Sequence, residues 1–146
     1  MRTKVSELKK SDESALRDIN NLLKQLVHDP ATYVAVSMRA LDEIIGNKNI
    51  ILVTAKDGQR VVGIGLLLVV TKFRGRYGYI EDMMVDREYR GHGIGRAIAE
   101  FLIGVARKQQ IKTLELSTRP SRVPANNLYQ KLGFERKETN VYRLHL

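Results

Sequence analysis

The sequence predicts a single α/β (α+β) domain, residues 1–146, with a mixed, mostly antiparallel central sheet and helices on both faces. Its 146 residues match the length of one domain. Strand-like and helix-like segments alternate along the chain, with short turns between them. Over residues 77–117 a strand, a glycine-rich turn, an amphipathic helix and a second strand follow one another, which predicts one parallel, right-handed strand–helix–strand unit.

The first half of the chain is expected to form three strands and two helices. Ser11 can cap the first helix, whose apolar residues recur at helical spacing until Asp29-Pro30 ends it. An Asp57-Gly58 turn predicts an antiparallel hairpin. In order, we expect a strand at 3–9, a helix from Ser11 to Asp29, a helix at 36–45, and strands at 49–55 and 60–71.

The second half is expected to continue the sheet. Ile94 to Ala106 carry apolar residues at helical spacing, and Pro124 suits the first turn of a further helix that Gly133 would cap. In order, we expect a strand at 77–85, a helix from 94, a strand at 113–117, a helix from 124 and two short strands within 134–146.

Composition narrows the classes of function. The chain has no cysteine, which excludes disulfides, thiolate metal sites and a cysteine nucleophile. His28, His92 and His145 have no spacing that suggests a metal site. No apolar stretch is long enough to span a membrane, and the first residues do not form a secretory leader, so we expect a cytoplasmic protein.

The charge is uneven along the chain. The net charge is +9, and residues 87–146 hold 12 Lys and Arg against 5 Asp and Glu, which leaves +7 in that part. An excess of this size suggests an anionic partner, such as nucleic acid, a phosphorylated cofactor or an acidic protein.

Three glycines in five residues separate the strand at 77–85 from the helix that follows it. The segment reads Arg90-Gly91-His92-Gly93-Ile94-Gly95. Glycine permits positive φ and close approach of a ligand, and a helix N-terminus offers free amides and a positive dipole end. Together they predict a site for a phosphate or pyrophosphate. The spacing fits neither the dinucleotide fingerprint nor the Walker loop.

The spacing Arg90-x-x-Gly93-x-Gly95 resembles the cofactor loop of the GNAT superfamily of acetyl-CoA-dependent N-acetyltransferases, Gln/Arg-x-x-Gly-x-Gly/Ala. A second stretch, Pro124-Ala-Asn-Asn-Leu-Tyr-Gln-Lys-Leu-Gly-Phe134, is similar to the family's Ala-x-x-Leu-Tyr-x-Lys-x-Gly-Phe helix. The resemblance is strong over 77–135 and only architectural over 1–60. It implies the GNAT-like acyl-CoA N-acyltransferase fold and an enzyme that uses acetyl-CoA as acyl donor, without a metal.

The resemblance also implies where acetyl-CoA binds. The pantetheine arm would pair with the strand at 83–85, which splays from the strand at 113–117, and the pyrophosphate would lie on the amides of residues 91–96. Where many relatives carry an asparagine that bonds the pantetheine amide, this chain has Arg122, and Asn126 could supply that contact instead. The expected cofactor-binding residues are Met83, Met84, Val85, Arg90, Gly91, His92, Gly93, Ile94, Gly95, Arg96, Arg122, Asn126 and Tyr129.

Acetyl transfer to an amine needs a base for the ammonium, donors for the oxyanion and a proton for the thiolate. Tyr129 is the candidate acid. Glu81 is the candidate base, because it interrupts an otherwise apolar strand, and burial there would make a carboxylate a stronger base. Asp82 points to the opposite face unless a bulge intervenes, so Glu81, Asp82 and water all stay open. The oxyanion donor is expected to be the backbone N–H of Met84 or a neighbour.

The leading hypothesis is an N-acetyltransferase that moves the acetyl group directly to a primary amine in a ternary complex. No motif in the sequence identifies the acceptor, which is either a small-molecule amine or a protein amine. One alternative is a non-catalytic acyl-CoA-binding module. A weaker one is a basic nucleic-acid-binding domain, for which the chain offers no basic helix face near 94–110. Dimers are common in the family, so a homodimer is an open expectation.

Overall fold

Five strands form one mixed sheet in the computed structural model, which describes residues 2–146. The strands lie side by side in chain order, β1 to β5; β1 to β4 are antiparallel and β5 is parallel to β4. Their bounds are Thr3–Glu7 for β1, Ile50–Asp57 for β2, Arg60–Lys72 for β3, Gly75–Val85 for β4 and Thr113–Leu116 for β5. The predicted mixed sheet and its parallel unit are therefore confirmed.

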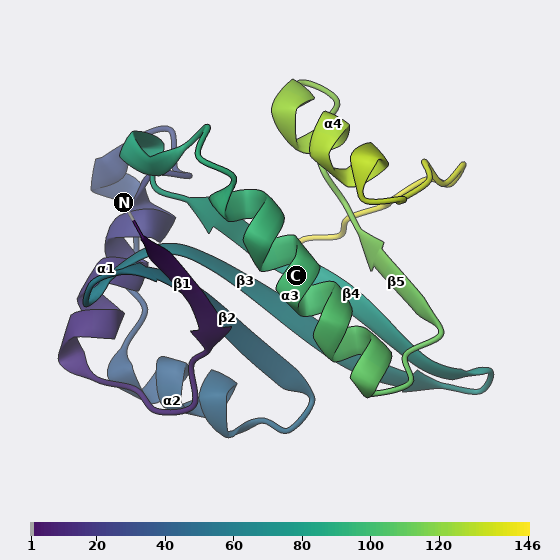
Figure 1. The fold of residues 1–146 in the computed structure, drawn as a ribbon, viewed down its shortest axis with the longest axis horizontal. Helices are drawn as coiled ribbons and strands as arrows, with labels where there is room; N and C mark the ends of the chain where they lie inside the picture. Colours follow the sequence, from purple (N-terminus) through teal and green to yellow (C-terminus); the bar gives the residue numbers. More distant parts are fainter. Residues whose placement is uncertain (1) are drawn as a thin grey trace.

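In the part of the chain that the structure describes, four helices flank the sheet (Figure 1). They are α1 at Glu13–Lys24, α2 at Met38–Gly46, α3 at Ile94–Lys108 and α4 at Val123–Lys131, and two short 3-10 turns lie at Pro30–Thr32 and Arg87–Tyr89. Helix α3 runs diagonally across one face of the sheet, and α4 lies beyond the end of β5. Among residues 2–146, no helix has the length and apolar content needed to cross a bilayer.

Two apolar clusters hold the helices on opposite faces of the sheet. Alternation along β2 and β3 sends one set of side chains toward α3, where Ile98 and Leu102 are fully buried. The opposite set, with Leu52 and Ile64, packs against α1 and α2, where Leu22 and Leu41 are almost completely buried. The sheet is thus covered on both faces, as its alternating strands require.

The first helix begins and ends differently from the prediction. Asp12, not Ser11, is its N-cap, because the Asp12 carboxylate accepts the backbone N–H of Ala15 at 2.8 Å. Ser11 instead donates to Asp42 of α2. The helix ends at Lys24, before the predicted stop at Asp29-Pro30, since Pro30 begins a separate 3-10 turn.

The two short strands predicted within 134–146 are wrong. Residues 135–146 form no helix or strand in the described part of the chain, and their side chains are exposed. A β-strand is defined by its hydrogen bonds to a neighbouring strand. The edge strand of the sheet, β5, is only four residues long. The strand-like pattern of this segment therefore does not produce a strand, because no partner strand lies beside it in the described part of the chain.

Candidate active site

A β-bulge in β4 brings Glu81 and Asp82 to the same site. On β3 two steps separate Ile64 from Leu66, whereas their partners Met84 and Glu81 are three steps apart on β4. Asp82, inside the bulge, has a φ of 49°, in the left-handed region. The alternation of β4 predicts Asp82 on the face opposite Glu81 unless a bulge intervenes. With the bulge present, Glu81 and Asp82 both line one cavity.

Gly65 lies opposite this bulge and must be small. A Cβ built there would lie 2.8 Å from Ile98 Cγ2 and 3.1 Å from Leu102 Cδ1, so α3 approaches β3 too closely for a side chain. The close approach of α3 therefore depends on this glycine.

Strands β4 and β5 diverge beside the bulge. Their parallel ladder ends where Ile80 pairs with Leu116, but β4 continues to Val85. Within residues 2–146, no strand pairs with that side of Glu81–Val85. Figure 1 shows β5 leaning away from β4 toward α4. The splayed strands expected from the resemblance are present, and they leave an unpaired edge on which an extended ligand can add as a strand does.

The glycine-rich loop lies directly after this edge. Gly91 and Gly93 have φ values of 79° and 78°, which favour glycine, and Gly93 is the N-cap of α3 without a side-chain cap. The α3 ladder begins with the N–H of Ala97 donating to Gly93 at 3.0 Å. The amides of residues 94–96 therefore have no acceptor within the helix, which is the arrangement that binds phosphate groups.

Side chains of the loop are partly committed to the protein. Arg90 Nε donates to the Val85 carbonyl at 3.1 Å, and Arg96 Nε pairs with Glu100 at 2.8 Å. His92 holds its ring nitrogen 3.3 Å from the Tyr89 carbonyl oxygen. These bonds use one nitrogen of each guanidinium, so an anion could meet the backbone amides of the loop together with the remaining guanidinium nitrogens.

Tyr129 reaches the opening from α4. Its hydroxyl donates to Met83 Sδ at 3.7 Å, and its ring meets Phe134 edge-on with 5.8 Å between ring centroids. Burial raises the pKa of Tyr129 above its ordinary value, against a smaller opposing effect of the Arg122 guanidinium. The phenol therefore stays protonated at neutral pH, and a thioether is a weak acceptor that a stronger one can displace.

A cavity of about 140 Å³ joins these groups. Glu81, Asp82 and Met83 line it from β4, and Arg122 and Tyr129 line it from α4 and the turn before it. Glu81, for which burial was considered as a way to strengthen the base, is exposed where β5 leaves the edge of β4. Tyr129, the candidate acid, nevertheless lines the same small cavity as Glu81 and Asp82.

Asn126 has a structural use in this chain. Its amide nitrogen donates to the carbonyls of Arg119 and Arg122, at 3.0 and 2.9 Å, and so shapes the turn before α4. Arg122 itself lines the cavity. Of the two residues considered for the pantetheine contact, Arg122 lies at the cavity and Asn126 holds the turn that carries it.

Asp86, Arg60 and Tyr89, which were not among the predicted site residues, support the glycine-rich loop. Buried Asp86 accepts the Glu88 N–H at 3.0 Å and binds Arg60 Nη2 at 2.9 Å. The same guanidinium lies 5.5 Å from the centre of the Tyr89 ring, whose hydroxyl donates to Asp57 at 3.2 Å. An aspartate directly after a strand and three residues before a Tyr-Arg-Gly turn is the signal that was available.

The α1–α2 segment, within the helices at 12–45 that the family resemblance places beside the acceptor, also borders the cavity. Leu26 lines the cavity, and Asn20 ties residues 33–36 to α1 through hydrogen bonds with Tyr33 and Val36. Arg87 donates from its backbone N–H and its guanidinium to Gln25, at 3.1 Å each. The segment is therefore fixed beside the two carboxylates.

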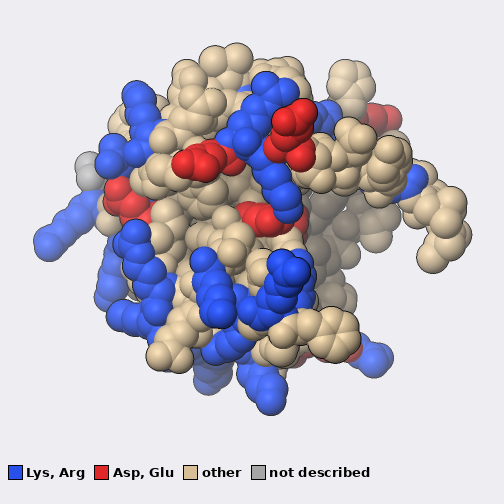
Figure 2. All heavy atoms as spheres, turned by 90° about the vertical axis from the view of Figure 1, so that its right-hand side faces the viewer, with Lys and Arg blue, Asp and Glu red and all other residues tan. Residues whose placement is uncertain are grey.

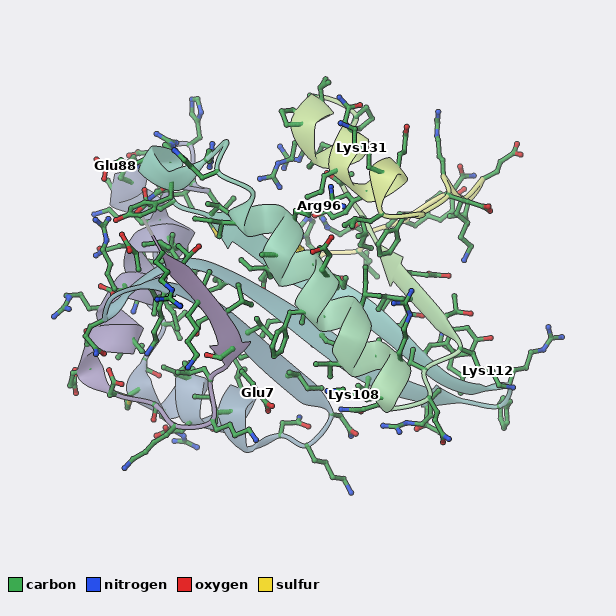
Figure 3. The ribbon with its side chains drawn as sticks, viewed as in Figure 1. Glu7, Glu88, Arg96, Lys108, Lys112 and Lys131 are labelled. Atoms are coloured by element: carbon green, nitrogen blue, oxygen red, sulfur yellow. The ribbon has the colours of Figure 1, made fainter. Side chains whose placement is uncertain are left out.

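The cationic excess is not concentrated at the loop. Figure 3 shows Arg96 and Lys131 on the elements that flank the opening, whereas Lys108 and Lys112 lie at the far end of α3. Helix α3 has 15 residues, about 22 Å of length. Figure 2 shows many Lys and Arg side chains over the end of the molecule where the β3–β4 hairpin lies. A phosphorylated ligand at the loop accounts for only part of the +7.

Comparison with known proteins identifies the family to which the chain belongs. The chain matches the model of the Acetyltransferase (GNAT) family over residues 14–134. It therefore belongs to the GNAT family of acetyltransferases, whose acyl donor is acetyl-CoA.

Curated relatives fall into several acceptor classes. Glucosamine 6-phosphate N-acetyltransferase of Trypanosoma brucei brucei is 37% identical over 85 residues, which is 56% of each chain. Glucosamine 6-phosphate N-acetyltransferase 1 of rice, Oryza sativa, is 29% identical over 132 residues, 86% of this chain and 78% of the relative. The [Ribosomal protein bS18]-alanine N-acetyltransferase of Escherichia coli is 42% identical over 53 residues, 36% of each. The first of these matches thus spans about half of the relative's length.

Solved structures share the whole fold. A Trypanosoma brucei acetyltransferase superposes with a TM-score of 0.80 at 28% identity, over 99% of this chain and 100% of that one. AAC(6')-Iy, in complex with a CoA bisubstrate analogue, has a TM-score of 0.78 at 15% identity and full coverage of both chains. The sheet and its helices therefore have the fold of the GNAT acetyltransferases.

Proposed function

We propose that this chain transfers the acetyl group of acetyl-CoA to a primary amine. The observation that carries the proposal is the cavity at the β4–β5 opening, where Tyr129, Glu81 and Asp82 meet beside the free amides of α3. Family membership supports acetyl transfer, and the loop and the unpaired β4 edge fit an extended donor with a pyrophosphate.

In the proposed reaction the amine nitrogen attacks the thioester carbonyl carbon, a C–N bond forms and the C–S bond breaks. The departing thiolate takes a proton from Tyr129. The attacking nitrogen, which becomes positively charged as the C–N bond forms, loses a proton to Glu81, to Asp82 or to water. The products are an amide and CoA thiol. The chain has no cysteine that could form an acetyl-cysteine intermediate. The amine therefore attacks acetyl-CoA directly, in a ternary complex.

The two carboxylates also favour a cationic acceptor. Glu81 and Asp82 are exposed to the cavity and would attract an alkylammonium before it is deprotonated. Relatives are named for glucosamine 6-phosphate and for the alanine of a ribosomal protein, so amino sugars and protein N-termini are the first classes to test.

A thiol-release assay with a panel of amines tests the proposal. The panel holds glucosamine 6-phosphate, an aminoglycoside, a polyamine and a peptide with an N-terminal alanine. Because the chain has no cysteine, a disulfide dye reports only the CoA released. Turnover with one amine class supports the proposal. Tight acetyl-CoA binding without turnover on any amine would instead support the non-catalytic module.

A further inference from the structure

The end of the molecule away from the glycine-rich loop is strongly cationic. Two segments form it, the β3–β4 hairpin at 72–76 and the end of α3 with its following turn at 107–112, and neither holds an Asp or Glu. Figure 2 faces this end and shows Lys and Arg side chains gathered on it, and Figure 3 places Lys108 and Lys112 there. We call the two segments the basic end; its cations are Lys72, Arg74, Arg76, Arg107, Lys108 and Lys112.

Hydrogen bonds join the two segments into one surface. The backbone N–H of Lys112 donates to the Arg76 carbonyl at 3.1 Å. The Arg76 guanidinium donates to the backbone carbonyl of Gln109 at 2.9 Å and to its side-chain oxygen at 3.0 Å. Cations that lie more than 30 positions apart in the sequence are thus brought together by two loops, without a basic helix face.

The cations of the basic end have no counter-ion within the protein. Among residues 2–146 the salt bridges lie elsewhere, and none of these six side chains takes part in one. Five of the six are exposed, and Arg76 is half-buried. Like charges gathered in this way repel one another, and an anionic partner removes the repulsion. A cofactor phosphate at the glycine-rich loop lies too far away to do so, because the 15 residues of α3 separate the two ends by about 22 Å.

Aromatic rings stand among these cations. Phe73, at the tip of the hairpin, is 112% exposed. Lys72 Nζ lies 4.5 Å from the centre of the Tyr77 ring and 5.0 Å from that of Tyr79, and both rings are partly exposed. Rings interleaved with Lys and Arg form the kind of surface on which unpaired bases stack while the cations hold the phosphates.

We propose that the basic end binds a single-stranded nucleic acid, with phosphates on its Lys and Arg side chains and a base stacked on Phe73. An acidic peptide would match the charges but would leave the Phe73 ring without a base to stack on. A duplex keeps its bases within its own stack, away from the ring. The proposal does not depend on acetyl transfer, because the basic end and the glycine-rich loop lie at opposite ends of α3.

Fluorescence anisotropy with a labelled oligo(dT) of about 12 nucleotides, at about 150 mM salt, tests the proposal. Phe73→Ser should weaken binding about tenfold, because a stacked base is lost, whereas its exposed position leaves folding unaffected. Phe73→Tyr keeps a ring and should keep the affinity. Val34→Ser, at an exposed apolar residue of the α1–α2 segment, is the matched control and should also keep it. Unchanged binding by Phe73→Ser overturns the proposal, as does a wild type that does not bind.

The salt dependence tests the charges. Arg74→Gln with Lys112→Gln should lower the slope of log affinity against log salt by about 1.4, since each phosphate contact on a single strand contributes about 0.7. Lys4→Gln with Lys24→Gln removes two exposed cations away from the basic end and should leave the slope unchanged. Saturating acetyl-CoA should not displace the oligonucleotide. Displacement would place the oligonucleotide at the glycine-rich loop and overturn the proposal, and so would tighter binding of a DNA duplex or an oligoglutamate peptide of equal length.

Discussion

Replacing Tyr129 by phenylalanine removes one hydroxyl from the candidate active site and little else. The ring keeps its edge contact with Phe134, and the lost hydrogen bond is to a thioether, so the free energy of unfolding should fall by less than about 1 kcal/mol. A positioned general acid contributes roughly 10²–10⁴-fold to a rate. Because burial raises the pKa of Tyr129, the phenol is a weaker acid than usual, and we expect the lower end, about 10²-fold in kcat or ~2.7 kcal/mol in the barrier.

Steady-state kinetics and calorimetry with acetyl-CoA separate this role from binding. The Kd of acetyl-CoA should change by less than about threefold, since the proton is needed only as the thiolate leaves. Tyr142→Phe, at an exposed residue near the C-terminus, is the matched control and should keep the wild-type kcat. In the wild type, the raised pKa of Tyr129 should delay any loss of kcat from phenol ionisation to above about pH 10. A Tyr129→Phe enzyme with unchanged kcat would refute the assignment.

Four further outcomes follow from the site. Gly93→Val should weaken acetyl-CoA binding at least tenfold by calorimetry, because its φ of 78° strains a β-branched residue, while Gly104→Val, in open space on α3, should not. Glu81→Gln should lower the rate most near neutral pH and recover as free amine accumulates at higher pH; an unchanged pH–rate profile would assign the base to Asp82 or water. Dephospho-CoA should bind about tenfold more weakly than CoA at low salt, and a fluorescence titration that finds equal affinities would exclude a cationic contact to the ribose phosphate. Asn20→Ala should raise the acceptor KM severalfold and leave the acetyl-CoA Kd unchanged, because its hydrogen bonds tie residues 33–36 to α1, next to the chain that carries Leu26 of the cavity lining; a shift in Kd alone would contradict this role.

The segment from β4 to α4 could be predicted because its signals are local. Glycines with positive φ at 91 and 93, the apolar spacing of α3 and the proline near the start of α4 each act within a few residues. The same holds for the hairpin at Asp57-Gly58. Where a turn or a cap decides the structure, the residues that decide it are neighbours in the sequence.

The exposure of Glu81 could not be predicted, because it depends on partners far along the chain. Apolar neighbours on β4 indicated burial, but β5 leaves β4 after Leu116 and opens that edge. The bulge at Asp82 likewise depends on pairing with β3 opposite Gly65. The C-terminal segment shows the converse, since a strand-like pattern forms no strand when no ladder partner lies beside it.

The position of the site follows from the order of the elements. Helix α3 begins nine residues after the end of β4, so its free amides lie at the end of the unpaired edge. Helix α4 follows β5 by a short turn, and because β5 diverges from β4, α4 stands across the opening with Tyr129 facing Met83. Two motifs more than 30 residues apart therefore flank one gap in the sheet. A ligand that fills the gap must be long enough to touch both, with phosphates at one end and its reactive atom at the other, which is the shape of an acyl-CoA.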